Sequence, residues 1–355
     1  MRRVLLTLLC GFATSSLNAG ELYYRTPGDT NSGNIYAVNE NGGTPRVVLY
    51  ASEYSPGGVV GMTRYNHVGS NGQALVQTRA YPATPDIELV FRAPNRAVIS
   101  RPVTAFGANN TLVPQIAPEV AQDDSFFSFR AVGGGRRTIW RLNVTVDEAL
   151  DPGYVPPTSF DDPRLQLLVD DPLPQNHVQT WSPDGTRMAY IDIRTNASGV
   201  EMIAIRLKDM GDPSTNPMDH PVILQDVRAT SRWMTVLQWS PVSDEILNMS
   251  TAADFTYAKA VWKCYADSPG IMTWVALPLL KTTKTQSVGE CLEHPLWRPD
   301  GLRIAAGYMK YTTTKSGTTR EAYPATLAPA GWPVFKLVST PVSRVNPQVP
   351  LGWTP

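Results

Sequence analysis

The chain has 355 residues, and its 31 lysine and arginine residues are balanced by 31 aspartate and glutamate residues. A neutral net charge provides no overall attraction for nucleic acid or an anionic membrane, so a nucleic-acid-binding function is not expected. The 31 prolines and 26 glycines favour many turns and short strands over long helices.

The N-terminus has the pattern of a secretory signal peptide. Arg2 and Arg3 precede an apolar run from Val4 to Phe12, and small residues continue to Ala19. This pattern predicts cleavage after Ala19. The run is shorter than the roughly 20 residues that cross a bilayer, and no later segment is longer and equally apolar. We therefore expect a signal peptide over residues 1–19 and one secreted domain over residues 20–355, without a transmembrane segment.

Three strand-like segments follow directly, with the sequences ELYYRT, GNIYAVNE and PRVVLYA, between residues 21 and 51. Each combines aromatic and β-branched residues with flanking Gly, Pro or Asn, which is typical of strands. They match the second, third and fourth strands of a repeating unit that becomes clear further along the chain.

That unit is clearest at Trp181, which begins the segment WSPDGTRMAYI. Trp239 begins WSPVSDEILNM and Trp297 begins WRPDGLRIAAGY, so the two intervals are 58 residues each. Trp353 follows after 56 residues in VPLGWTP, and weaker copies place Val68 and Val120 in the same register. Six evenly spaced copies indicate a repeat architecture.

The residues of each copy predict a tight turn between two antiparallel strands. Pro fixes φ in the turn, Asp tolerates the next position, and Gly adopts the left-handed conformation. Asp184 and Asp300 are therefore expected to be turn residues rather than paired catalytic carboxylates. After Trp181, the strand-like segments RMAYIDI, VEMIAIRL and HPVILQDV complete a unit of four short strands.

Units of four strands that cannot bury both faces alone predict a β-propeller. The N-terminal segments supply only the last three strands of a unit, and the C-terminal VPLGW supplies only the first. We therefore expect an all-β, six-bladed propeller of four-stranded blades, with the C-terminal strand completing the N-terminal blade and removing exposed edges.

The segments WSPDGTRMAYI and IYAVNENGGTPRVVL (Ile35 to Leu49) resemble the repeats of the TolB-like six-bladed propellers. The resemblance covers most of the chain after Ala19 but lacks the N-terminal α/β domain of TolB. It implies a Gram-negative periplasm and protein binding at the mouth of a central channel. Prolyl-oligopeptidase relatives carry similar propellers beside a hydrolase domain, for which we find neither room nor a G-x-S-x-G motif. The expected function is therefore non-enzymatic binding or scaffolding of an envelope protein, with no cofactor.

The segments that lead into the innermost strands should surround one mouth of the channel. They contain residue types that are enriched at protein-binding surfaces. The candidate partner-binding residues are Arg64, Tyr65, His177, Arg232, Trp233, Met234, Glu293 and His294.

Three of the four histidines, His67, His177 and His294, fall in these leading segments. Three imidazoles that converge on a channel could hold a catalytic zinc ion with an open position. Their different offsets from the repeat register argue against convergence, so no metal site is predicted. The alternative function is a metal-dependent polysaccharide lyase or hydrolase that uses these histidines.

Two further features concern cysteines and a long polar segment. Cys264 and Cys291 are the only cysteines after the signal peptide, and an even pair in a secreted protein predicts a disulfide, with two buried thiols as the alternative. The Thr-, Ser- and Lys-rich segment from Met309 to Trp332 predicts an exposed hairpin, either a contact arm or a loop without function.

Overall fold

The computed structural model describes twelve stretches of the chain: 20–26, 33–53, 59–62, 75–78, 86–92, 97–106, 113–133, 135–172, 178–227, 233–251, 259–343 and 349–353. The predicted signal peptide, residues 1–19, lies outside these stretches. So does Val68, the repeat position assigned to the second unit.

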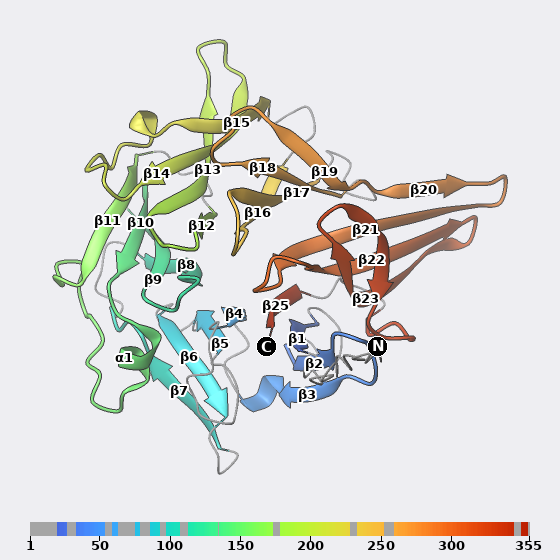
Figure 1. Ribbon diagram of the computed structural model, residues 1–355, viewed down its shortest axis with the longest axis horizontal. Coiled ribbons are helices and arrows are strands. Elements are labelled where there is room, and N and C mark those ends of the chain that lie inside the picture. Colours follow the sequence, from blue (N-terminus) through green and yellow to red (C-terminus); the bar gives the residue numbers. More distant parts are fainter. Residues whose placement is uncertain are drawn as a thin grey trace, which may run out of the picture.

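The described residues form antiparallel sheets arranged around a common centre, as Figure 1 shows. Five sheets have four strands and one has five. This confirms the predicted all-β class and the propeller-like arrangement of four-stranded units. In each four-stranded sheet, one strand lies nearest the centre and the others follow outward.

The first three sheets come from the N-terminal half of the chain and from its C-terminal strand. The first contains β25 (Val349–Trp353), β1 (Glu21–Arg25), β2 (Ile35–Asn39) and β3 (Arg46–Leu49), in that order. The second contains β4 (Val59–Met62), β5 (Leu75–Thr78), β6 (Ile87–Arg92) and β7 (Val98–Pro102). The third contains β8 (Val113–Val120), β9 (Phe127–Gly133), β10 (Arg136–Leu142) and β11 (Leu165–Asp171).

The last three sheets follow in chain order. The fourth contains β12 (Gln179–Trp181), β13 (Arg187–Thr195), β14 (Glu201–Asp209) and β15 (Val222–Val227). The fifth contains β16 (Trp233–Trp239), β17 (Glu245–Thr251), β18 (Ala260–Tyr265) and β19 (Met272–Ala276). The sixth contains β20 (Leu279–Thr282), β21 (Gln286–Trp297), β22 (Ile304–Thr314), β23 (Gly317–Ala328) and β24 (Gly331–Lys336).

Short helices occupy some of the connections between strands. The helix α1 (Val146–Leu150) lies between β10 and β11, where the Thr145 side chain and Glu148 form a reciprocal capping box. The 3₁₀ turns η1 (Ala51–Glu53) and η3 (Pro217–Asp219) follow β3 and precede β15.

The C-terminal strand β25 pairs with the N-terminal strand β1. Leu22 lies opposite Trp353, and Arg25 lies opposite Val349 in this antiparallel pair. The last strand of the chain therefore belongs to the same sheet as the first three, as the sequence predicts.

The repeated corners have the predicted turn chemistry. The Asp184 carboxylate accepts hydrogen bonds from Ser182 Oγ, at 2.6 Å, and from the backbone and hydroxyl of Thr186. Gly185 has φ of 65°, the left-handed conformation that glycine adopts without strain. Asp300 likewise accepts from the Leu302 backbone, so the turn role predicted for both aspartates is confirmed.

The tryptophans that end β12, β16, β21 and β25 belong to the core between neighbouring sheets. Trp181 is 0 % exposed, and its ring lies edge-on to Phe126 of the third sheet with centroids 4.5 Å apart. Its indole N–H donates to Ser128 Oγ of β9 at 2.8 Å. An aromatic ring with a satisfied polar group can thus join two sheets without leaving an unpaired donor.

The predicted disulfide is wrong. Cys264 and Cys291 are both buried free thiols, and they belong to different hydrophobic clusters. Cys264 faces the apolar layer between the fourth and fifth sheets, whereas Cys291 packs with Met309 and Tyr311 of the sixth sheet. Burial raises the pKa of each thiol to about 12, which keeps both in the unreactive protonated form.

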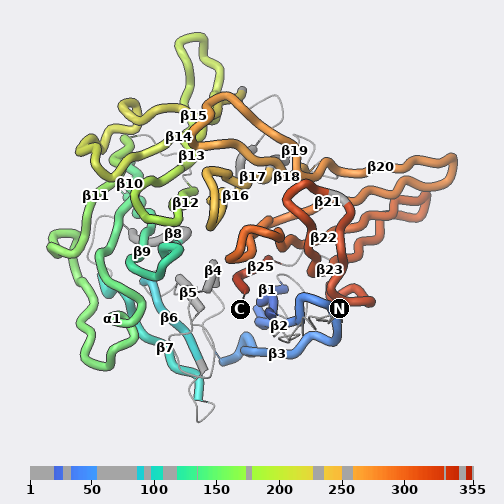
Figure 2. The backbone as a smooth tube through the Cα atoms, in the orientation of Figure 1, coloured from blue at the N-terminus to red at the C-terminus, as the bar shows by residue number. Residues whose placement is uncertain are grey.

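The sixth sheet has one strand more than the four that the sequence predicts for each unit, and some of its strands are longer than expected. The hairpin expected over 309–332 is present as β22 and β23, but it is exposed only at its outer end, since the residues from Ala322 to Leu327 are buried; β20 and the outer half of β21 extend alongside it (Figure 2). The segment Gly289–Pro295, expected to be a loop, lies inside β21. The pairing of β21 with β22 shifts between Glu293 and Leu296, which marks an irregularity at the end of the expected loop.

Replacing Trp181 with alanine should strongly destabilise the protein, because the change opens a cavity between two sheets and removes the bond to Ser128. We expect Trp181→Ala to lower the free energy of unfolding by about 3–5 kcal/mol, measured by denaturant or thermal unfolding. The matched control is Trp274→Ala on β19, whose side chain is 39 % exposed. Equal effects of the two substitutions would contradict the proposed packing role.

Candidate functional site

The innermost strands have two distinguishable ends. At one end, here called the corner end, β8, β12, β16 and β21 finish at the repeated turns, and β25 finishes at Trp353. At the opposite end, here called the loop end, these strands begin, except that β21 begins further out in the sixth sheet. Both ends carry polar side chains from different sheets, and the loop end contains Glu293 and His294, two of the predicted partner-binding residues.

At the loop end, a charged group that we call the mouth cluster comprises Arg25, Lys259, Glu293 and His294. Arg25 ends β1 in the first sheet, and Lys259 immediately precedes β18 in the fifth. Glu293 and His294 lie in β21 of the sixth sheet. Three sheets therefore contribute side chains to this cluster.

Glu293 is the buried acid of this cluster. Only 2 % of the residue is exposed, and its Oε2 lies 2.5 Å from Lys259 Nζ. Its Oε1 is buried and has no hydrogen-bond partner among the described residues. A buried carboxylate costs free energy unless its charge and its lone pairs are satisfied. Lys259 satisfies the charge, and one oxygen retains acceptor capacity.

His294 follows Glu293 with an unusual backbone conformation. Its φ is 51°, in the left-handed region that few residues other than glycine adopt. Its backbone N–H points to the Met249 sulfur at 3.4 Å. Burial, together with the smaller effect of the nearby positive charges of Lys259 and Arg25, lowers the pKa of the imidazole to about 4. The ring is thus neutral at physiological pH.

At the corner end, Glu119, Gln122 and Thr180 connect three sheets. Gln122 Nε2 donates to the backbone oxygens of Trp181 and Trp239, at 2.9 and 3.1 Å. The Thr180 hydroxyl donates to Glu119 Oε1 at 3.2 Å and accepts from the Trp239 backbone N–H. Burial raises the pKa of Glu119 to about 8, with the Thr180 bond opposing this shift. The carboxyl group is therefore largely protonated at neutral pH.

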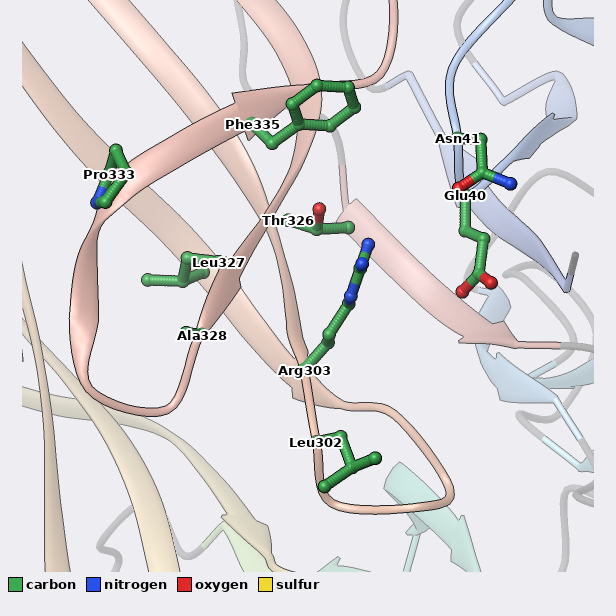
Figure 3. Close-up of a pocket in the computed structure, with 9 residues that line it drawn as sticks. All are labelled: Glu40, Asn41, Leu302, Arg303, Thr326, Leu327, Ala328, Pro333 and Phe335. Atoms are coloured by element: carbon green, nitrogen blue, oxygen red, sulfur yellow. The ribbon is translucent and has the colours of Figure 1, made fainter.

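A shallow pocket of about 440 Å³ lies between the first and sixth sheets (Figure 3). Its wall combines buried Leu327 with the exposed side chains of Leu302 and Phe335. Arg303 stands in the middle of the view, and Glu40, which forms an ion pair with Arg298 at 2.9 Å, closes one side. This pocket lies apart from the mouth cluster and contains none of the predicted site residues.

The predicted partner-binding residues are only partly described by the structure. Arg64, Tyr65, His177 and Arg232 lie outside the described residues. Trp233 and Met234 begin β16, where their backbones pair with Thr251 and Ser250 of β17. Glu293 and His294 are adjacent members of the mouth cluster. The structure thus brings these last two together and leaves the assembly of all eight residues a prediction.

Sequence reasoning missed Arg25, Lys259 and Glu119. Lys259 precedes the apolar strand AVWKCY, and Arg25 ends the apolar strand ELYYR, so each looks like an ordinary flanking charge. Their proximity to Glu293 and His294 depends on the register between sheets that are distant in sequence. Glu119 could have been noticed as an acid inside an otherwise apolar inner strand.

A second buried charged network was also missed, and it is structural. Asp192 accepts from Arg194 Nε at 2.8 Å and from Arg206, and Arg194 also lies 3.0 Å from Asp171 of the third sheet. His220 Nε2 donates to the Ser214 carbonyl, so its Nδ1 accepts from the Tyr190 hydroxyl at 2.7 Å. The Arg194–Asp171 ion pair joins the fourth sheet to the outer strand of the third, and the other contacts lie within the fourth sheet and its connections.

The metal hypothesis required convergence of His67, His177 and His294. Only His294 lies within the described stretches, where no group of three or more His, Cys, Asp or Glu side chains is arranged to hold a metal ion. Across the same stretches, no helix is long and apolar enough to span a membrane.

Comparison with known proteins gives a fold rather than a family. No protein-family model matches the chain, and no curated protein matches it. The chain is similar to a crystal structure of a puromycin hydrolase mutant complexed with PGG, with 12 % identity and a TM-score of 0.50. That match covers 92 % of this chain and 53 % of the hydrolase. A GH43 glycoside hydrolase matches with 13 % identity, a TM-score of 0.40, and coverage of 82 % and 55 %.

This chain therefore spans about half the length of the solved structures that it matches. At such low identity the likeness to puromycin hydrolase shows a shared β-propeller fold. It also corrects the expectation that the chain is not an enzyme. That expectation took the repeat architecture as a sign of binding without chemistry, whereas the same architecture occurs in a hydrolase.

Ionisation of Glu119 should lower the stability of the folded protein as the pH rises from neutral to alkaline values. The folded-state pKa, about 8, lies above the unfolded value, so the contribution of the protonated acid is full at low pH and is lost as pH rises through 8. Relative to Glu119→Gln, the natural protein should lose unfolding free energy between about pH 5 and pH 9. Denaturant titrations of both proteins across this range test it. A constant difference would contradict the raised pKa.

His294 should make the stability of the protein depend on pH in the opposite direction, with a loss as the pH falls. Its folded-state pKa of about 4 lies below the unfolded value, so the contribution of the neutral ring is present above pH 6.5 and declines as pH falls through 4. The comparison protein is His294→Asn, because asparagine accepts the left-handed backbone and does not titrate. The stability difference between the two should change between pH 7 and pH 4. A two-dimensional NMR titration of the imidazole provides an independent reading of the pKa.

Proposed function

We propose that the chain is a six-bladed β-propeller of the TolB-like type that binds a partner protein at the loop end of its central channel. Each of the six sheets is one blade in this proposal, and β25 closes the ring by pairing with β1. Contacts of β25 with both β4 and β21 support this closure, because they join the first sheet to its neighbours on either side.

The observation that carries the binding proposal is the mouth cluster. Charged side chains from the first, fifth and sixth sheets are held at one end of the inner strands, where Glu293 keeps one buried acceptor oxygen. Such a fixed and incompletely satisfied group suits an incoming amide or ammonium group, since pairing with it removes a cost already present in the free protein.

The neighbouring residue types favour a protein as the partner. Trp233 and Met234 begin β16, and Arg232 precedes them in the sequence; Arg, Trp and Met are enriched at protein interfaces. The other candidates, Arg64, Tyr65 and His177, are assigned to this surface from the repeat register. Together with Glu293 and His294 they would form a rim around the channel opening.

The proposed cellular location is the periplasm, and the proposed partner is an envelope protein. Both rest on the signal-peptide pattern over residues 1–19 and on the TolB-like repeat motif.

A metal-dependent lyase or hydrolase is the alternative. It requires His67, His177 and His294 to bind one metal ion, and the shared fold with a hydrolase keeps catalysis open. Metal analysis of the purified protein and of His177→Ala separates the alternatives. Stoichiometric metal that is lost in the variant would support the lyase or hydrolase.

The binding proposal is tested by photo-crosslinking in the native envelope. A photoreactive amino acid at position 233 should yield a discrete adduct with one protein, whereas the same amino acid at position 242 should not. Val242 is a suitable control because it is exposed and lies in the turn after β16, at the corner end. Adding Glu293→Gln should weaken the adduct at position 233. Equal adducts at both positions, or none at either, would count against binding at the loop end.

A further inference from the structure

The sixth sheet carries a projecting arm with an unusual charge. We define the arm as residues 279–289 and 310–320, which form the outer parts of β20 to β23. In Figures 1 and 2 these strands extend beyond the outline of the other sheets. The arm ends in two neighbouring turns, Lys284-Thr285 between β20 and β21, and Lys315-Ser316 between β22 and β23.

The 22 arm residues include five basic side chains and no acidic one. The basic residues are Lys281, Lys284, Lys310, Lys315 and Arg320. Because the whole chain has equal numbers of basic and acidic residues, the remainder has 26 basic against 31 acidic ones. The neutral net charge therefore conceals a strong separation, with a cationic arm on an anionic body.

The arm surface is rich in hydroxyl groups, with ten Ser or Thr among its 22 residues. Strand register places Thr282, Ser287, Thr313 and Thr318 in one row across four strands. Ser287 Oγ lies 3.3 Å from Thr282 Oγ1, and the Thr313 and Thr318 hydroxyls lie 3.0 Å apart. Lysines with interleaved hydroxyl donors are the groups that proteins use to contact phosphates.

The other residues of the arm distinguish a lipid surface from a protein partner. Protein interfaces are depleted in Lys, and their energetic centres are enriched in Trp, Tyr and Arg. The arm has Lys at both turns, and its one tyrosine, Tyr311, is buried in the sheet beneath Arg320. In addition, Leu280 is 63 % exposed beside Lys281. Basic groups beside an exposed apolar side chain are typical of segments that lie on anionic bilayers.

We propose that this arm docks the protein onto an anionic phospholipid surface. Lys284 and Lys315, at the two projecting turns, contact lipid phosphates, and Leu280 enters the headgroup region. The projection of the arm allows a flat surface to reach both turns while the anionic body stays away from it. This inference concerns a surface separate from the mouth cluster and does not depend on the function proposed above.

The test is co-sedimentation with vesicles at low ionic strength. The protein should bind vesicles of equal parts phosphatidylglycerol and phosphatidylcholine, and should not bind pure phosphatidylcholine. Salt should weaken the binding. Inorganic phosphate at constant ionic strength should not displace the protein, which distinguishes a lipid surface from a site for the free ion.

Two variants with the same change in net charge locate the binding. Lys284→Gln combined with Lys315→Gln should lower the partition coefficient about 5-fold per lysine. The control combines Arg46→Gln with Arg136→Gln, two exposed cations outside the arm, and should lower it much less. Thermal unfolding of each variant verifies that the fold is retained.

Three results would overturn the inference. The natural protein could fail to bind phosphatidylglycerol vesicles, the control variant could lose as much binding as the arm variant, or the arm could bind polyglutamate but not the vesicles. The last result would instead assign the arm to an acidic protein segment.

Discussion

Burial of both faces of each sheet is the constraint on which the rest of the structure depends. A sheet of four short strands has two faces, and in this protein apolar residues of adjacent sheets share common clusters. The tryptophans at the ends of the inner strands help to meet this constraint, because they are buried in clusters that adjacent sheets share. The Trp181 N–H has a partner in the adjacent sheet. Once the sheets are fixed in this way, their inner ends hold the polar groups at the centre in defined positions.

Those central groups contrast with one another in charge. At the loop end, burial and two cations keep His294 neutral, and Glu293 pairs with Lys259. At the corner end, Glu119 lacks a cation within hydrogen-bonding distance among its described neighbours, and burial favours its protonated form. The two ends of the same set of strands thus offer different chemistry. At the loop end one buried carboxylate oxygen of Glu293 keeps acceptor capacity, whereas the corner end mainly ties sheets together through Gln122 and Thr180.

Much of the fold could be predicted from the sequence because the repeat is local. The corner after Trp181 is specified by four consecutive residues, and the apolar segments RMAYIDI and VEMIAIRL coincide closely with β13 and β14. Features that depend on distant residues were not predictable in the same way. The Glu293–Lys259 pair spans two sheets, and β20 is separated from β19 by only Leu277 and Pro278, although the two strands belong to different sheets. Cys264 and Cys291 suggested a bond by their number alone, but their side chains lie in different clusters. Function was less predictable still, since a hydrolase shares the propeller fold.

The pairing of β25 with β1 also has a consequence for the order of folding. Leu22 and Trp353 are adjacent in space but lie near opposite ends of the chain, so β1 to β3 cannot complete their sheet until residues 349–353 are available. The other sheets are built from strands that follow one another directly, and loop closure within them is less costly. The N-terminal strands should consequently be among the last to acquire their final packing during synthesis. Until then, the inner edge of β1 remains unpaired. A chaperone that protects the nascent chain would therefore have to cover this edge for longer than the edges of the other sheets.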